Sequence, residues 1–168
     1  MVREVGEREV LARLAELGIE HEVIAIDPAF ADTAAFCERY DSPLENAANT
    51  LLVTSRRKPH VDALCVVLAT SRLDVNKKVR AAVGAGKLSF APVERMAELT
   101  GMRVGGVTPF GVPDHLPVLV DQRVMERPWV IVGTGGRASK LRIAPDALLA
   151  LPSAVVADLA RDPPPPTA

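Results

Sequence analysis

The segment LTGMRVGGVTPFG, residues 99–111, combines the end of a helix with a glycine-rich loop. Residues 92–100 are predicted to form that helix, because a glycine follows them at the usual place for a helix end. Within the loop, Gly105 and Gly106 let the backbone approach a ligand closely and adopt positive φ. Since a strand is expected at 116–121, the loop is either a tight turn between two elements or one wall of a binding site.

A second glycine-rich segment, Gly133-Thr134-Gly135-Gly136, follows a predicted strand at 129–132. Residues 133–138 match the G-x-G-x-x-A dinucleotide pattern, but that pattern requires a helix after it, and the following residues alternate like a strand. Two glycine loops beside strands can expose successive N–H groups, which hold anions and suit the oxyanion that forms when water attacks an ester. The pair of loops therefore favours a ligand site over two unrelated turns.

Outward from these loops, the chain alternates short helical and strand-like segments. The further predicted helices are 6–18, 33–40, 74–83 and 145–151, and the further predicted strands are 21–26, 49–54, 62–69, 87–90, 141–143 and 154–159. Several strands follow one another without a helix between them. We therefore expect a mixed α/β fold, with a partly barrel-like sheet surrounded by helices, rather than a doubly wound parallel sheet. Residues 1–160 are predicted as a single domain, and the proline-rich residues 161–168 as a disordered tail.

The composition fits an ordinary water-soluble domain, with 168 residues, 48% hydrophobic and 24% charged. The longest apolar run, 63–69, is too short to cross a bilayer, and the charged residues near Met1 do not suggest a signal peptide. The two cysteines, Cys37 and Cys65, form no disulfide framework, so a cytoplasmic location is expected. No metal site is predicted, because neither the cysteines nor the histidines stand at ligand spacing.

The net charge of −1 gives no overall attraction to nucleic acid. Basic residues nevertheless gather in three places along the chain. They are Arg72, Lys77, Lys78, Arg80 and Lys87; then Arg137, Lys140 and Arg142; and finally Arg56, Arg57 and Lys58. Each cluster is either a solvated face or a set of phosphate contacts.

Residues 99–111 resemble the "LTG…GGxxPxG" signature of the YbaK/EbsC family, which is related to the editing domain of bacterial prolyl-tRNA synthetases. Residues 73–79, 116–121 and 133–145 agree with that family in order and spacing. The resemblance implies a mixed α/β fold and trans-editing, the hydrolysis of a small amino acid wrongly attached to tRNA. It also implies that no cofactor, metal or membrane takes part. The implied partners are the aminoacylated 3′ end of a tRNA and an aminoacyl-tRNA synthetase.

The resemblance also assigns residues to the site. The amino-acid pocket would be shaped by Gly105, Gly106, Thr108 and Pro109, and the facing loop by Gly133, Thr134, Gly135 and Gly136. The candidate catalytic positions would be Asn49, Gly133, Thr134 and Gly135. Further substrate-binding positions would be Thr33, Thr50, Lys77 and Lys140. The family chemistry is expected to use backbone donors and the ribose hydroxyl of the substrate instead of a protein nucleophile.

One position departs from the family pattern. The family carries a catalytic lysine in the strand motif K-T-L-V, and Asn49 takes its place here. An asparagine amide can donate a hydrogen bond but brings no charge, and a charge-assisted bond contributes roughly 1.5–3 kcal/mol. Two alternatives follow: an editing enzyme of a variant subfamily marked by Asn49, or a non-catalytic module that binds tRNA or a synthetase. In the first, Lys140 is a candidate to supply the missing charge. Asn49 can also bond a hydroxyl, which favours a Ser or Thr substrate, while Lys140 argues against Cys.

Overall fold

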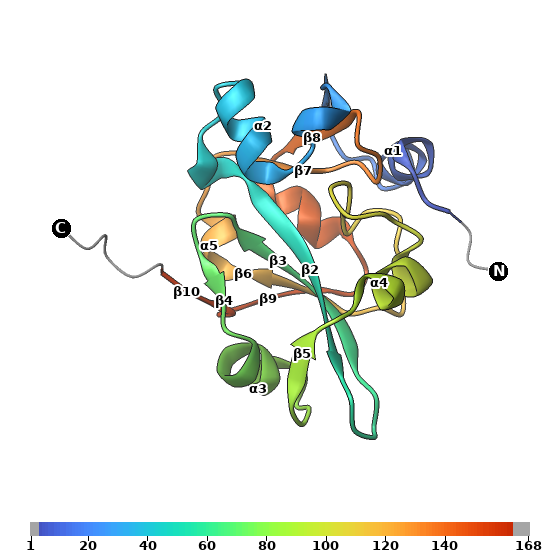
Figure 1. Ribbon diagram of the computed structural model, residues 1–168, viewed down its shortest axis with the longest axis vertical. Coiled ribbons are helices and arrows are strands. Elements are labelled where there is room, and N and C mark those ends of the chain that lie inside the picture. Colours follow the sequence, from blue (N-terminus) through green and yellow to red (C-terminus); the bar gives the residue numbers. More distant parts are fainter. Residues whose placement is uncertain (1–3, 163–168) are drawn as a thin grey trace.

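A five-stranded sheet in the order β5-β2-β3-β6-β9 forms the centre of the protein (Figure 1). The structure is a computed structural model that describes residues 4–162. The strands are β2 (Ala48–Ser55), β3 (Asp62–Leu68), β5 (Leu88–Phe90), β6 (Val118–Asp121) and β9 (Ala154–Ala157). β2 runs antiparallel to β3 and β5, whereas β3, β6 and β9 run parallel to one another. The sheet is therefore mixed, as the succession of strands predicts.

Two smaller sheets accompany the central one. The first has the order β1-β8-β7 and is antiparallel, with β1 (Glu22–Ala25), β7 (Val130–Gly133) and β8 (Ser139–Ile143). The second pairs β4 (Arg72–Leu73) with β10 (Ala160–Arg161). An isolated parallel bridge, Ala47 to Ile131, connects the central sheet with the first of these.

The expected partial closure into a barrel is not what forms. The described strands make separate ladders; β2 packs near β7, and the isolated Ala47–Ile131 bridge links the two sheets. Closing a barrel requires a continuous, staggered ladder around the whole circumference, which this bridge does not provide. The fold is thus a mixed α/β arrangement of sheets and helices.

Helices cover the sheets. Their bounds are α1 (Glu7–Glu16), α2 (Thr33–Arg39), α3 (Arg80–Val83), α4 (Val93–Thr100) and α5 (Gln122–Met125), with the short turns η1 (Pro28–Phe30), η2 (Leu44–Asn46), η3 (Val75–Val79) and η4 (Pro145–Ala150). Two of the described helices, α3 and α4, end at a glycine with left-handed backbone. The helix predicted before the first glycine loop is α4, and Gly101 ends it with φ of 71°. Left-handed backbone at this position favours glycine, which explains the helix end.

The helix predicted at 74–83 is divided into a π-turn, η3, and a single α-helical turn, α3. Elements such as α5, β4 and β10 were not predicted, because a few residues carry no measurable periodicity. β10 includes Arg161, which pairs with Arg72 and therefore lies in a strand, one residue past the predicted domain end. Residues 163–168 of the predicted tail lie outside the described residues.

Both faces of the central sheet are buried. Alternate residues of a strand point to opposite faces, so Leu64 and Val66 of β3 join one core cluster, while Cys65 and Val67 join another. The first cluster packs against α1, and the second packs against η3 and β5. This double coverage accounts for the long apolar run of β3, which is typical of a strand buried on two sides.

Candidate functional site

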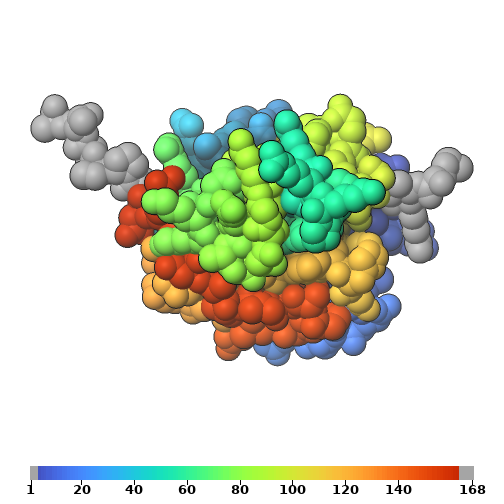
Figure 2. Space-filling model, turned by 90° about the horizontal axis from the view of Figure 1, so that it is seen from below, coloured from blue at the N-terminus to red at the C-terminus, as the bar shows by residue number. Residues whose placement is uncertain are grey.

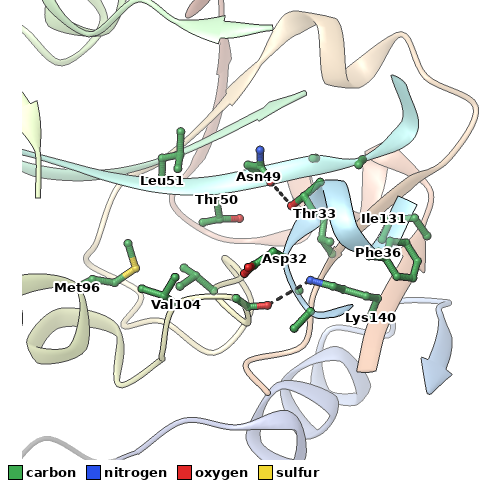
Figure 3. Close-up of a pocket in the computed structure, with 17 residues that line it drawn as sticks. Asp32, Thr33, Phe36, Asn49, Thr50, Leu51, Met96, Val104, Ile131 and Lys140 are labelled. Carbon is green, nitrogen blue, oxygen red and sulfur yellow. Dashed lines mark hydrogen bonds between the residues drawn. The ribbon is translucent and has the colours of Figure 1, made fainter. Parts of the chain in front are cut away.

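A cavity of about 240 Å³ lies between the first half of β2, the start of α2, the first glycine loop and the β7–β8 pair (Figure 3). This half of β2 is beyond the residues that pair with β5, so its edge is open toward the cavity. Most of the lining is apolar. The lining residues are Ala31, Asp32, Thr33, Phe36, Ala47, Ala48, Asn49, Thr50, Leu51, Met96, Val104, Gly105, Val107, Ile131, Val132, Gly133 and Lys140.

Two polar side chains of the cavity are paired with each other. Thr33 Oγ1, at the first turn of α2, donates a hydrogen bond of 2.6 Å to Asn49 Oδ1 on β2. This bond fixes the amide of Asn49, because its oxygen is held by the threonine hydroxyl. The position that carries a lysine in the family thus holds a neutral, oriented side chain.

Thr50 differs from its neighbour on the strand. Its side chain points from β2 into the cavity (Figure 3), and the residue is only 7% exposed. Among the described residues, no group forms a hydrogen bond with Thr50 Oγ1. A buried hydroxyl without a partner is costly, by about 1–3 kcal/mol, so this hydroxyl is available to a bound ligand.

Lys140 brings a positive charge into the cavity from the opposite side. It extends from β8, is 6% exposed, and its Nζ donates a hydrogen bond of 3.2 Å to the carbonyl of Gly105 (Figure 3). Burial lowers the pKa of Lys140, and the carboxylate of Asp32 opposes this effect. The ammonium group therefore lies in an environment of low polarity, where its interactions are stronger than in water.

The two glycine loops pack directly against each other. The N–H of Gly135 donates a 2.6 Å hydrogen bond to the carbonyl of Gly106. A Cβ on Gly133 would lie 2.7 Å from the carbonyl oxygens of Gly106 and Val107, and a Cβ on Gly106 would lie 2.7 Å from that of Gly136. Only glycine permits such a close approach of backbones, so the loops form one continuous wall.

Arg137 connects the segments around the cavity mouth. Its guanidinium donates to the carbonyl of Val104 at 2.9 Å and to that of Pro28 at 3.3 Å, and it lies 3.8 Å from a carboxylate oxygen of Asp32. Three loops that are distant in sequence are thereby held together.

The structure brings some of the sequence-predicted residues together at the cavity. Those that line it are Thr33, Asn49, Thr50, Gly105, Gly133 and Lys140. Others lie in or behind the glycine wall, namely Gly106, Thr108, Pro109, Thr134, Gly135 and Gly136. Thr134 bonds the hydroxyl of Ser139 and not the cavity, and the engaged N–H of Gly135 is directed to Gly106.

Lys77 is not among the lining residues. It is exposed on η3, whose Val75 and Val79 pack in the second core cluster. Sequence reasoning also missed Asp32, Met96 and Val104 as lining residues. The approach of α4 to β2 is a tertiary feature, so no local pattern marks Met96 as part of a site.

Two further searches concern metals and membranes. Within residues 4–162, no group of three or more His, Cys, Asp and Glu side chains is placed to hold a metal ion. In the same range, no helix has the length and hydrophobicity needed to cross a bilayer.

Comparison with known proteins shows which family the sequence matches. The sequence profile of the aminoacyl-tRNA editing domain matches residues 27–151. The prolyl-tRNA editing protein ProX of Acetoanaerobium sticklandii is 29% identical over 135 residues, covering 76% of this chain and 78% of ProX. EbsC of Enterococcus faecalis is 26% identical over 96 residues, covering 57% of this chain and 58% of EbsC.

A solved structure agrees with these relatives. A protein assigned as a trans-editing enzyme for prolyl-tRNA synthetase superposes with a TM-score of 0.80 at 28% identity, covering 92% of this chain and 96% of that one. The range matched by the family profile, residues 27–151, includes both glycine loops and β2. The resemblance to the YbaK/EbsC family is confirmed, and the chain belongs to the aminoacyl-tRNA editing domain family.

Proposed function

We propose that the protein is a trans-editing enzyme, which hydrolyses the ester between a small, wrongly attached amino acid and the 3′ end of a tRNA. The family supports an editing role, and the relative ProX is a prolyl-tRNA editing protein. A synthetase pocket discriminates by only about 1–3 kcal/mol per methylene group, so a second pocket that admits the wrong amino acid is needed.

The size of the cavity supports a small amino acid as the bound group. Its volume of about 240 Å³ is below the range of roughly 300–1,000 Å³ that is typical of drug-sized ligands. The apolar lining would bury an aliphatic side chain, while Thr50, Asn49 and Lys140 provide the polar contacts. Such a cavity suits an aminoacyl group and leaves the nucleotide outside.

The observation that carries the proposal is Lys140. Its ammonium lies in the cavity although Asn49 occupies the position of the family lysine. An ammonium has three N–H donors, and the described structure uses one of them at Gly105. A second donor can bind the ester carbonyl, where a charge-assisted bond stabilises the negative oxygen of the transition state.

The reaction would then proceed by attack of water on the ester carbon. The carbonyl oxygen becomes negative against Lys140, the bond from carbon to the ribose oxygen breaks, and the ribose oxygen takes up the proton that water releases. The neighbouring ribose hydroxyl is positioned to relay that proton. We assign the oxyanion contact to Lys140 rather than to the N–H of Gly135, because that N–H already donates to Gly106.

A deacylation assay tests the function. Purified protein is incubated with tRNAs charged with Ala, Ser, Thr or Cys, and the release of amino acid is compared with spontaneous hydrolysis. We expect one small amino acid to be released faster than it is without protein, and Lys140→Ala to reduce that rate by about 100-fold or more. Lys77→Ala is the matched control, since it removes an exposed lysine outside the cavity and should leave the rate unchanged.

A different result would favour the non-catalytic alternative. If no ester is cleaved faster than it decays while tRNA still binds, the protein is a binding module on the editing fold. If Lys140→Ala and Lys77→Ala reduced the deacylation rate equally, the reaction would not depend on the cavity lysine. That result would contradict the role given to Lys140.

A further inference from the structure

The turn between β2 and β3 carries a cluster of positive charges. Arg56, Arg57 and Lys58 are consecutive and exposed at this turn, which we call the basic tip. None of the three side chains forms an ion pair with another residue in the range 4–162. Because like charges repel, three adjacent cations are favourable where an anion neutralises them.

Some other cations of the protein pair with carboxylates within the fold. Lys78 pairs with Asp158, and Arg95 pairs with Asp62, the first residue of β3, which lies opposite Thr54 beside the turn. The basic tip is instead extended by a further cation. Ser55 of β2 pairs with Leu88 of β5, so Lys87 follows at the position beside Arg56.

An apolar track leads from the basic tip toward the cavity. Phe90 of β5 lies opposite Val53, which is two residues along β2 from the cavity-lining Leu51. Phe90 is 56% exposed although it is a large aromatic residue. Seen from the hairpin end of the molecule, the teal basic tip and the yellow-green segment of β5 and α4 adjoin on one face (Figure 2).

The same track continues along α4. Val93 is 61% exposed, and Met96, one helical turn further, lines the cavity. Residues three apart lie on the same helix face, so Val93 and Met96 share one surface. The basic tip, Phe90, Val93 and the cavity are therefore successive points on a single path.

The length of the path fits a strand of nucleic acid. Asn49 and Arg56 are seven residues apart on β2, which corresponds to about 23 Å at about 3.3 Å per residue. Stacked nucleotides of one strand advance by about 3.4 Å each, so the path would accommodate roughly seven of them. This exceeds a single nucleotide and reaches beyond the terminal ester into the body of an RNA.

We propose that this surface holds the 3′-terminal segment of the substrate RNA, a conclusion that rests on the proposed function. The basic tip and Lys87 contact phosphates, the ring of Phe90 stacks on a base, and the path directs the terminal ester into the cavity. Cationic side chains for the backbone with an exposed aromatic ring for the bases are the usual combination for unpaired nucleic acid.

Binding of uncharged tRNA tests the surface independently of catalysis. We expect Arg56→Ala/Arg57→Ala to weaken binding about tenfold at low salt, and to reduce the slope of log affinity against log salt by about 2. The control Arg8→Ala/Arg72→Ala removes the same charge from exposed residues of α1 and β4 that do not line the cavity. It should change neither value.

Two further variants identify the type of contact. Arg56→Lys/Arg57→Lys keeps both charges and should retain the salt slope of the wild-type protein. Phe90→Leu keeps an apolar side chain but loses the stacking face, so it should weaken binding about tenfold without changing the slope. Equal weakening in the hairpin variant and its control, or no weakening in the hairpin variant, would overturn the proposal.

Cleavage rates separate this proposal from the proposed function. We expect Arg56→Ala/Arg57→Ala to lower kcat/KM for aminoacylated tRNA about tenfold. Hydrolysis of an aminoacyl ester of adenosine alone should be unchanged, since that small substrate has no phosphates to contact the basic tip. An equal decrease in kcat/KM for both substrates would contradict the proposed role of this surface in binding RNA. If neither substrate is cleaved while the tRNA-binding results hold, the proposed function is wrong and the RNA surface stands.

Discussion

The two walls of the cavity use their polar groups in opposite ways. In the glycine wall, the backbones of both loops are bonded or packed against each other, as in the Gly135–Gly106 hydrogen bond. In the β2 wall, Thr50 has a hydroxyl without a partner, and Asn49 is oriented by Thr33. The comparison teaches that the glycine wall is internally satisfied and gives the cavity its shape, while β2 carries the hydroxyl that our proposal assigns to substrate selection. The charge of Lys140 enters from β8, beside the glycine wall.

The largest effect is expected when the ammonium group is removed from β8, and a second variant places it on β2 instead. Lys140→Met should lower the deacylation rate by about 100- to 1,000-fold, the effect of losing one oxyanion donor. The double variant Lys140→Met/Asn49→Lys places an ammonium on β2, and it should recover part of that loss. The measurement is single-turnover release of the amino acid that the wild-type protein prefers.

The same variants test whether the rate depends on which wall carries the charge. Asn49→Lys alone would put two ammonium groups across one small cavity, which disfavours the charged form of each. A double variant no faster than Lys140→Met would mean that the position of the charge, and not only its presence, is essential.

The next effect concerns the stability of the glycine wall. Gly133→Ala should lower the free energy of unfolding by about 1–3 kcal/mol, because its Cβ would press against two carbonyl oxygens of the other loop. Gly86→Ala is the matched control, since a Cβ there has no neighbour within 4 Å. Denaturant unfolding measures both, and a neutral Gly133→Ala would show that the loops can separate without cost.

A smaller effect is expected on the β2 wall. Thr50→Val removes the hydroxyl and keeps the shape, so cleavage of Ser or Thr esters should fall by about 2- to 10-fold, while an Ala ester is unaffected. Stability should not decrease, because the hydroxyl has no partner among the described residues. If the cleavage rate fell equally for the Ser, Thr and Ala esters, Thr50 would not determine which amino acid is selected. Its role would then be to position the substrate.

The most gradual effect is the dependence on pH. In the proposed mechanism the ammonium form of Lys140 is the active one, so kcat/KM should decrease as pH rises through its pKa. Burial places that pKa below the ordinary value of 10.5. The decrease should therefore begin at a lower pH than for an exposed lysine. Lys140→Arg, which stays protonated, should move the decrease to higher pH after correction for spontaneous hydrolysis. An unchanged profile would exclude Lys140 as the titrating group.

The sequence predicted the elements with strong periodicity and clear ends. The hairpin of β2 and β3, the helix α4 with its terminal Gly101, and both glycine loops occur where their patterns place them. Short elements such as β4 and β10 escaped prediction, because their existence depends on pairing between residues far apart in the chain. The openness of the sheets is likewise a tertiary property, since it depends on which strand edges meet.

The site was predictable in composition but not in arrangement. Thr33, Asn49 and Lys140 were identified as candidates, and the structure brings them to one cavity. The packing of one glycine loop on the other was not foreseen, because glycine is equally compatible with a ligand and with a second backbone. Lys77 resembled a site residue by position in the sequence, yet it is exposed on η3 and is not among the residues that line the cavity.

Three of the residues lining the cavity are alanines, Ala31, Ala47 and Ala48, and all are buried. Each alanine can gain methyl groups by a single substitution, which would shorten the cavity without touching Lys140 or Thr50. The volume of the cavity and its chemistry are thus encoded at separate positions. A descendant of this protein could change the amino acid that it accepts in one mutational step while its hydrolytic apparatus stayed intact.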